Sequence, residues 1–506
     1  MKYVNWFASI LILLNVSCNS KNENAIKIYS DTPVSTNFIG NGVQWSAYPH
    51  ADTENAEWGK LMTDEKWEMN YNRLDYMQPK LFRVLDQANW RYLVGFDKNG
   101  DPVLDFTTPE VKAVEKILDY AQTNNITVMM GEWGTPYKVH DTDQGYSDKF
   151  SGAADPKWIN AIAEYLEFLI KERGYTCIKY YNLINEPNGY WASNKGDFNE
   201  WREAVLLFNK VIREKGLDQY VSIAGPDAVT RYDNPESTYP GLGWVEESAK
   251  QIGDGIGIFE IHDYTAHDLV KSGEFKIFHK QAADIAAEEG KQIIFGELGM
   301  NRSGQKNQDR ASADPFACED SQMEVYDHSY GVYMADAVIQ GMNAGFSGAA
   351  AWALDDAMHT CGDLGNKNEL KRWGMWNSLG TEICNDPADE NIRPWFYSWS
   401  LMCRYFSVGS TIVKTDTTGI DGVRLTAGVF NDELTVAIVN NADIDNVLSL
   451  AIPTKKPVQK FIYVEGESKV DENGFPVAVE KDIKSGKITE VSLPANSFVL
   501  FTTLDY

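Results

Sequence analysis

Basic residues are scarce in this sequence. Its 506 residues include 46 Lys and Arg against 73 Asp and Glu, which gives a formal net charge of -27 at pH 7. Such a surface repels phosphate backbones, so we do not expect a nucleic-acid partner. The acidic excess does not identify a substrate, because it is also a common way for a protein to stay soluble.

Nucleotide-binding motifs and metal-ligand clusters are also missing. No GxGxxG or GxxxxGK[ST] run follows the early predicted strands, which argues against the usual nucleotide-binding classes. The six cysteines form no CxxC pair and no His/Cys cluster with metal spacing. We therefore expect no metal and no organic cofactor.

Cysteine is sparse enough to limit the number of disulfides. Five cysteines follow Cys18, and in an exported protein they allow one or two disulfides, for which the last four are favoured. Because five is odd, at least one thiol stays free, and Cys177, just before a buried strand, is the favoured one. The five are Cys177, Cys318, Cys361, Cys384 and Cys403.

Long apolar runs are absent after the N-terminus, where Lys2 precedes the apolar stretch 6–14. That stretch is too short for a mature membrane helix, and Cys18 follows it. The pattern resembles a bacterial lipoprotein signal over residues 1–18, with Cys18 lipidated. We expect an outer-membrane lipoprotein that contacts the membrane only through this anchor. The alternative is a plain secretory signal and a secreted protein.

The rest of the chain has the composition of a packed globular protein, with 43% hydrophobic residues. Over residues 37–405, eight apolar strands alternate with longer amphipathic segments. Several strands are almost continuously apolar, as expected for parallel strands covered on both faces. This order predicts an α/β (β/α)₈ TIM barrel. The predicted strands are 38–45, 80–86, 126–133, 178–186, 220–225, 255–264, 292–298 and 345–354.

Helix-start and helix-stop signals separate these strands. Thr108 and Pro109 open one helix, and Asp155 and Pro156 open another, as an N-cap followed by proline at the first position. The second helix ends at Gly174, a residue type favoured just after helices.

After a last predicted helix at 393–406, the pattern changes to short alternating strands separated by Gly, Asn, Asp and Pro. Residues 406–506 therefore predict an all-β sandwich domain. Within residues 19–36, otherwise a tether, 25–30 is a candidate further strand of this sandwich.

Two glutamates stand at the ends of predicted barrel strands. Glu186 ends the fourth strand and Glu297 ends the seventh. A single Glu at a strand end is usually a surface residue. Two of them converge on one mouth when the barrel closes, and barrel active sites lie at that mouth. A pair of facing carboxylates is what the cleavage of a glycosidic bond requires.

These residues resemble the catalytic motifs of glycoside hydrolase clan A. The resemblance implies a retaining enzyme in which Asn185 and Glu186 supply the sugar contact and the acid/base, and Glu297 is the nucleophile. It also implies roles in substrate binding for Arg83 on the second strand, for His262 and Tyr264 on the sixth, and for Trp352 on the eighth. Tyr264 would hydrogen-bond the nucleophile and hold it ionised.

Two families of the clan fit the motifs. The run 185–191, which ends in Trp191, resembles family 39, whereas Arg83, His262, Tyr264 and Trp352 suit family 5 equally. Where family 5 members usually carry a His near the end of the third strand, this chain has Glu132 and Trp133. We expect both to line the pocket, with Glu132 contacting sugar hydroxyls. Among further strand-end and loop tryptophans, Trp45, Trp90, Trp373 and Trp376 are candidates for the same mouth.

Simpler structural explanations exist for single residues. Arg83 could pair with a core carboxylate, and His262 and Tyr264 could be hydrogen-bonded core residues. For the whole chain, a non-catalytic glycan-binding lipoprotein with a disused barrel pocket is the main alternative, and a structural lipoprotein that docks a partner through the sandwich is another. We expect a monomer that cleaves O-glycosidic bonds of a poly- or oligosaccharide.

Overall fold

The computed structural model describes residues 25–134, 149–302, 304–484 and 488–506. The predicted signal segment 1–18, with Cys18, lies outside the described residues. Among the helices that are described, none is both long and apolar enough to cross a membrane.

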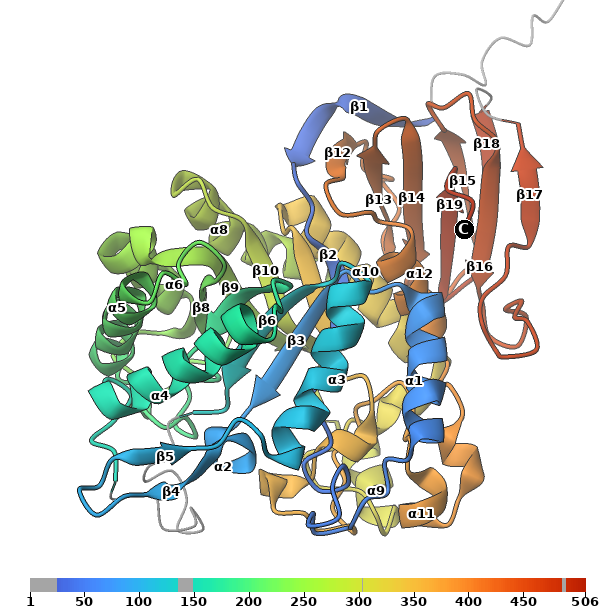
Figure 1. The fold of residues 1–506 in the computed structure, drawn as a ribbon. Helices are drawn as coiled ribbons and strands as arrows, with labels where there is room; N and C mark the ends of the chain where they lie inside the picture. The colour runs from blue at the N-terminus through green and yellow to red at the C-terminus, as the bar shows by residue number, and fades with distance from the viewer. Residues whose placement is uncertain (1–24, 135–148, 303, 485–487) are drawn as a thin grey trace, which may run out of the picture.

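Eight parallel strands close into a barrel, which confirms the predicted (β/α)₈ architecture (Figure 1). Their order around the barrel is β2, β3, β6, β7, β8, β9, β10 and β11, after which β11 pairs with β2 again. The strands are β2 (Gly40–Gln44), β3 (Leu81–Asp86), β6 (Thr127–Glu132), β7 (Ile178–Asn182), β8 (Ser222–Val229), β9 (Ile256–Thr265), β10 (Ile293–Met300) and β11 (Gly348–Ala351).

Helices surround the barrel, and the predicted caps begin them. The Thr108 side chain accepts a hydrogen bond from the Val111 amide, and Asp155 accepts one from Lys157. The longer helices are α1 (Asp64–Met77), α3 (Pro109–Thr123), α4 (Pro156–Glu167), α5 (Phe198–Glu214), α6 (Gly241–Ile252), α8 (Glu274–Glu288), α10 (His328–Ala344) and α12 (Phe396–Arg404).

Shorter elements decorate the barrel loops. A hairpin that was not predicted joins β4 (Leu93–Phe96) to β5 (Pro102–Leu104). The short α-helices are α2 (Ala88–Arg91), α7 (His267–Ser272), α9 (Gln305–Ala313) and α11 (Gly380–Cys384), and a π-helical turn (Phe168–Glu172) extends α4. Five 3₁₀ turns are η2 (Gly253–Gly255), η3 (Met323–Tyr326), η4 (Asp356–Met358), η5 (Cys361–Asp363) and η6 (Pro387–Glu390) among the described residues.

The C-terminal strands form the predicted sandwich, and the N-terminal strand joins its two layers. β1 (Ile26–Ser35) pairs antiparallel with β12 and parallel with β15. Apolar residues from both layers enclose one core. The other strands are β12 (Thr411–Thr415), β13 (Val423–Phe430), β14 (Glu433–Asn440), β15 (Asn446–Ala451), β16 (Val458–Tyr463), β17 (Glu480–Ile483), β18 (Ile488–Leu493) and β19 (Ser497–Thr502).

The sandwich packs on α10 and α12. Phe461, Phe498 and Leu500 share one apolar cluster with the barrel, and the Tyr463 hydroxyl donates to the His328 carbonyl over 2.9 Å. In Figure 1 the arrowhead of β3 points away from the sandwich, so the sandwich supports the side of the barrel and leaves the carboxyl ends of its strands open.

Two strand boundaries differ from the prediction. β7 ends at Asn182 rather than Glu186, because the chain turns out of the sheet before Pro187. β8 continues past Gly225, where the predicted strand 220–225 ended. The register shifts between Pro226 and Ala228, so the proline falls at a bulge where no ladder hydrogen bond is required of it.

Candidate active site

A cavity of about 830 Å³ opens at the carboxyl ends of the barrel strands. Most of the residues that the sequence singled out line it: Trp133, Asn185, Glu186, Trp191, Tyr264, Glu297 and Trp352. Arg83 and His262 do not line it but lie fully buried directly beneath, in contact with the lining carboxylates.

Glu297 is held by donors on both carboxylate oxygens. Arg83 Nη1 donates to Oε1, and the Tyr264 hydroxyl donates to Oε2, as the sequence predicted for Tyr264. Both donors stabilise the negative charge on Glu297. The register of β10 against β9 shifts between Phe295 and Glu297, so Gly296 is an extra residue and Glu297 lies opposite His262. Bulges of this kind re-aim side chains beside active sites.

Arg83 bonds both the buried carboxylate of Asp227 and two residues that line the cavity, Glu297 and Asn185. Its Nη2 donates to Asn185 Oδ1 over 2.8 Å and to Asp227 Oδ1 over 3.1 Å. Burial opposes the guanidinium charge, but the carboxylates of Glu297 and Asp227 outweigh that effect and raise the pKa of Arg83. Arg83 therefore connects Glu297, Asn185 and Asp227 as a fixed positive charge.

Glu186 lies in the loop after β7 rather than on the strand. Its backbone has φ of 49°, in the left-handed region that residues other than glycine rarely occupy, and its amide donates to Asp227 Oδ2 over 3.1 Å. Trp191 Nε1 donates to Glu186 Oε2 over 2.7 Å, and His262 Nδ1 lies 3.0 Å from Oε1. Such backbone conformations persist only where the surroundings fix them.

His262 lies between Glu186 and the carboxylates under the cavity. Its Nε2 is 3.1 Å from Asp227 Oδ1 and 3.2 Å from Glu260 Oε1. Burial disfavours the charged ring, but Glu297, Asp227 and Glu260 outweigh this and hold the pKa of His262 well above its usual range. Both ring nitrogens of His262 therefore lie within hydrogen-bonding distance of carboxylate oxygens, Nδ1 of Glu186 and Nε2 of Asp227.

Asp227 and Glu260 are site residues that the sequence analysis missed. Asp227 was missed because the predicted strand 220–225 stopped before it, and its only local signal was an acidic residue after an apolar run. It anchors Arg83, His262, the amide of Glu186 and, over 3.0 Å, Asn182 Nδ2. Glu260 lies on β9 two residues before His262 and is completely buried. Burial and the charge of Asp227 raise the pKa of Glu260 to about 8.

Aromatic side chains stand on two sides of the cavity. Trp133, Trp352 and His359 form one group, in which Trp352 and His359 stack with ring centroids 5.3 Å apart. Trp191 and Tyr232 form another, with centroids 4.9 Å apart. Trp90 and Trp373 also line the cavity, as expected. The expectations for Trp45 and Trp376 are wrong, because both rings are fully buried in the core.

Glu132 does not contact the cavity, so its predicted role toward sugar hydroxyls is wrong. It is buried at the end of β6, where Tyr92 donates to it over 2.8 Å, Tyr181 over 3.3 Å and the Ala88 amide over 2.9 Å. Burial and the charge of Asp86 raise the pKa of Glu132 to about 8. These donors hold the Glu132 carboxyl in the core, outside the cavity lining.

Histidine and carboxylate ligand atoms gather in two places within the described chain. Those of Glu186, His262 and Glu297 lie within 4.8 Å of one another, as do those of Asp227, Glu260 and His262. The ligand atoms in both groups already have protein partners, since Arg83 and Tyr264 bond Glu297, and His262 contacts Glu186 and Asp227. The arrangement is suited to proton transfer and to charge stabilisation at a carboxylate.

The disulfide expectation is also met. Cys318 and Cys361, two of the last four cysteines, form a disulfide, and Cys177 is free. The other free thiols among the described residues are Cys384 and Cys403.

Residues 40–330, more than half of the chain, match the family described as Cellulase (glycosyl hydrolase family 5). The chain belongs to this family. Of the two families that the motifs allowed, family 5 is therefore the one supported, despite Glu132 and Trp133 at the end of the third strand. As a family 5 protein of clan A, the chain is a glycoside hydrolase. Among curated proteins, no sequence matches it.

Solved structures with the same fold share little sequence with this family 5 chain. The family 30 subfamily 8 xylanase Xyn30A from Clostridium acetobutylicum is 13% identical, with a TM-score of 0.60 and coverage of 95% of this chain and 99% of that one. A conserved exported protein from Bacteroides fragilis is 13% identical, with a TM-score of 0.65 and coverage of 94% and 100%. The family 51 α-L-arabinofuranosidase AbfB from Bifidobacterium longum is 12% identical, with a TM-score of 0.62 and coverage of 94% and 99%. At such identities the likeness concerns the fold.

Proposed function

We propose that this glycoside hydrolase is a retaining enzyme in which Glu297 is the nucleophile and Glu186 the acid/base. The observation that carries the proposal is the short gap between two carboxylates over one cavity, where an oxygen of Glu186 and one of Glu297 lie within 4.8 Å. Retaining enzymes hold their carboxyl groups about 5–5.5 Å apart, whereas inverting enzymes need roughly 6.5–9.5 Å to admit a water.

In the first step, Glu297 forms a bond to the anomeric carbon while the bond to the leaving oxygen breaks and that oxygen takes a proton from Glu186. Arg83 and Tyr264 keep the attacking carboxylate charged and oriented. His262 Nδ1, 3.0 Å from Glu186 Oε1, orients the acid/base carboxyl for this transfer.

In the second step, water attacks the anomeric carbon, Glu186 takes a proton from that water and the bond to Glu297 breaks. Asn185 is fixed for this chemistry, because its Oδ1 accepts from Arg83 and its Nδ2 is left to donate to the sugar 2-hydroxyl. The aromatic groups on both sides of the cavity suit stacking on the apolar faces of sugars, so the substrate is a poly- or oligosaccharide.

The experiment is a screen of polysaccharides and aryl glycosides with the wild type, Glu186→Ala, Glu297→Ala and the control Glu236→Ala. Glu236 is an exposed carboxylate in a neighbouring loop. Loss of either site carboxylate should lower kcat by about 10⁴-fold or more. Azide should restore turnover to both variants, giving a glycosyl azide of retained configuration with Glu186→Ala and of inverted configuration with Glu297→Ala.

Hydrolysis that survives loss of Glu297, or a first product of inverted configuration from the wild type, would contradict the retaining mechanism. Calorimetry that shows tight glycan binding without turnover of any panel member would favour the non-catalytic binding alternative.

We also propose export and lipid anchoring at Cys18 of a monomer, on the basis of the signal sequence. The Cys318–Cys361 disulfide supports export, because disulfides persist in oxidising compartments. Incorporation of labelled palmitate into the wild type, absent from Cys18→Ser, tests the anchor.

A further inference from the structure

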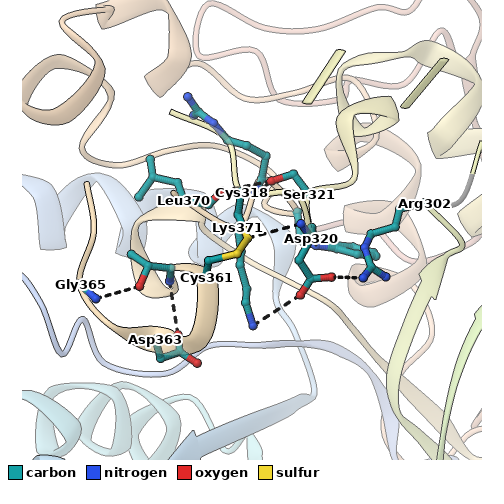
Figure 2. The surroundings of a disulfide bond; sticks show 12 residues. Arg302, Cys318, Asp320, Ser321, Cys361, Asp363, Gly365, Leu370 and Lys371 are labelled. Carbon is teal, nitrogen blue, oxygen red and sulfur yellow. Dashed lines mark hydrogen bonds and ion pairs between the residues drawn. A yellow bond between two sulfur atoms is a disulfide. The ribbon is translucent and has the colours of Figure 1, made fainter. Parts of the chain in front are cut away.

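Three chain segments meet at one wall of the cavity, and the segment around Cys318 is far in the sequence from the two around Cys361 and Lys371. The Leu370 amide donates to the Phe316 carbonyl, and the Cys318 amide donates to the Leu370 carbonyl, over 2.7 and 2.8 Å. The Cys361 amide donates to Glu369, and the Cys318–Cys361 disulfide closes the assembly. The three segments therefore behave as one cross-linked unit (Figure 2).

Each segment contributes one charged residue to the cavity. Asp320, Asp363 and Lys371 all line it, and we call them the charged wall. In Figure 2 the Lys371 side chain reaches past the disulfide with its ammonium directed toward Asp320. Trp373, which also lines the cavity, donates from Nε1 to the Asp320 carbonyl and packs edge-to-face on Tyr264, with ring centroids 5.2 Å apart.

The Lys371 ammonium has N–H donors that no hydrogen bond within the described residues uses. Within the described residues its ion pair is with Asp320 Oδ2 at 3.7 Å, beyond hydrogen-bonding distance, and its side chain is only 14% exposed. Nζ also lies 5.5 Å from the ring centroid of Trp133, which fixes its position above that face. An ammonium offers three N–H donors, so a bound sugar can accept from it without breaking a protein hydrogen bond.

Acceptors stand on either side of this donor. Asp320 is paired with Arg302 at 2.7 Å, and Asp363 lies 3.1 Å from His359 Nδ1. The wall thus carries one lysine charge between two carboxylates, and the site carboxylates Glu186 and Glu297 also act on Lys371. Together with Arg302, which also lines the cavity and pairs with Asp320, the charged wall holds as many cations as carboxylates, so it offers a carboxylated sugar no excess positive charge.

The wall adjoins the nucleophile rather than the acid. Trp373 contacts Tyr264, which bonds Glu297, whereas Trp191 and Tyr232 stand beside Glu186. Because the acid protonates the leaving oxygen, the leaving group lies toward Trp191. The glycone, which becomes bonded to Glu297, lies toward the wall.

We propose that Asp320, Asp363 and Lys371 form a hydroxyl-recognition subsite that selects an uncharged glycone with free neighbouring hydroxyls. Lys371 donates to one sugar oxygen while the carboxylates accept from adjacent hydroxyls. This inference rests on the proposed hydrolytic function and adds the class of sugar to it.

The test measures kcat/KM for aryl glycosides of neutral mono- and disaccharides in both anomeric forms, and for the aryl glucuronides. Lys371→Met should lower kcat/KM for the best neutral substrate by about 10- to 100-fold. The matched control is Lys367→Met, because Lys367 is exposed in the same loop and does not line the cavity. Circular dichroism and thermal unfolding check that each variant is folded.

Monodeoxy forms of the best substrate separate recognition from structural support. Removal of the hydroxyl that Lys371 contacts should lower the kcat/KM of the wild type by about 10- to 100-fold. The same removal should lower the kcat/KM of Lys371→Met by less than about threefold, because that variant has already lost the contact. Asp320→Asn, an isosteric change at a partly exposed residue, is the second variant and should lose selectivity for a neighbouring hydroxyl.

The outcomes distinguish the inference from the function on which it rests. A wild type that cleaves no substrate contradicts both. An active wild type whose kcat/KM is unchanged in Lys371→Met and Asp320→Asn contradicts only the subsite. Preference of the wild type for a glucuronide, lost in Lys371→Met, would show an anion site and overturn the choice of an uncharged sugar.

Discussion

The floor of the cavity and its charged wall are both built from charged side chains, yet they are positioned differently. We define the floor as Arg83, Asp227, His262, Tyr264 and Glu297, which all come from barrel strands and bond one another. The wall comes from three loop segments tied by hydrogen bonds and a disulfide. The comparison separates the carboxylate network, which barrel strands position, from the proposed sugar recognition, which loop segments position.

The largest expected effect comes from breaking the floor at Arg83. Arg83→Met leaves Glu297 and Asp227 buried without their cation. We expect kcat/KM to fall by roughly 10³-fold and the free energy of unfolding by about 3–5 kcal/mol. Kinetics on the best aryl glycoside and urea denaturation measure both.

The control for Arg83 is Lys280→Met, which removes an exposed pair with Asp284 and should change stability by less than about 1 kcal/mol. A similar small change for Arg83→Met would show that the buried network is not essential.

A smaller effect is expected at Trp191, which reaches the acid from the side opposite the wall. Trp191→Phe keeps an aromatic ring but removes the N–H that Glu186 Oε2 accepts. We expect kcat/KM to fall by about tenfold, the usual size for a hydrogen bond to a charged group. Tyr29→Phe is the control, because Tyr29 is an exposed residue of β1 in the sandwich and does not line the cavity. Equal kcat/KM for the two variants would mean that the Trp191 N–H does not contribute to the function of Glu186.

The disulfide should affect the wall and leave the floor intact. Replacement of Cys318 and Cys361 by serine frees a loop of 43 residues, for which chain entropy predicts a loss of up to about 4 kcal/mol in unfolding free energy. We expect KM to rise about threefold with kcat retained, since local hydrogen bonds still hold the segments together. Dithiothreitol should reproduce this in the wild type and have no effect on the double variant. A fall in kcat alone would mean that the cross-link supports the floor.

Glu132 should have no effect on catalysis and a measurable one on stability. Its folded pKa of about 8 lies above the unfolded value, so the folded state keeps a proton that the unfolded state releases, and stability falls as pH rises through that range. Glu132→Gln should remove up to about 3 kcal/mol of this pH-dependent loss between about pH 5 and about pH 8. Urea denaturation at both pH values measures this difference. A changed KM in Glu132→Gln would mean that Glu132 does take part in substrate binding.

Much of the floor could be predicted, because a residue at the end of a barrel strand must lie near the mouth of the barrel. Glu297, Tyr264 and His262 follow apolar runs with a period of two, and closure of the barrel brings such ends together. Asp227 was not predicted, because in a sequence a proline at a bulge cannot be distinguished from a proline after the end of a strand. Glu132 was misplaced because strand position does not show which way a terminal side chain turns.

The wall could be predicted only in part. The segment 355–380, with Asp363 and Lys371, follows the eighth barrel strand and so belongs at the mouth, where its charged residues would set specificity. That Asp320 joins them could not be predicted from local pattern. Asp320, Asp363 and Lys371 lie in segments without periodicity, and their meeting depends on hydrogen bonds such as that between Cys318 and Leu370. The candidate disulfide cysteines limited the choice, but several pairings among the last four were compatible with the sequence.

The position of β1 determines how the molecule bears load. Tension along the chain from residues before Ile26 enters through β1, whose hydrogen bonds to β12 and β15 run across the direction of the strand. A pull along that strand shears many bonds at once instead of peeling them singly. The sandwich therefore takes up a pull on the N-terminal segment before that pull reaches the catalytic barrel.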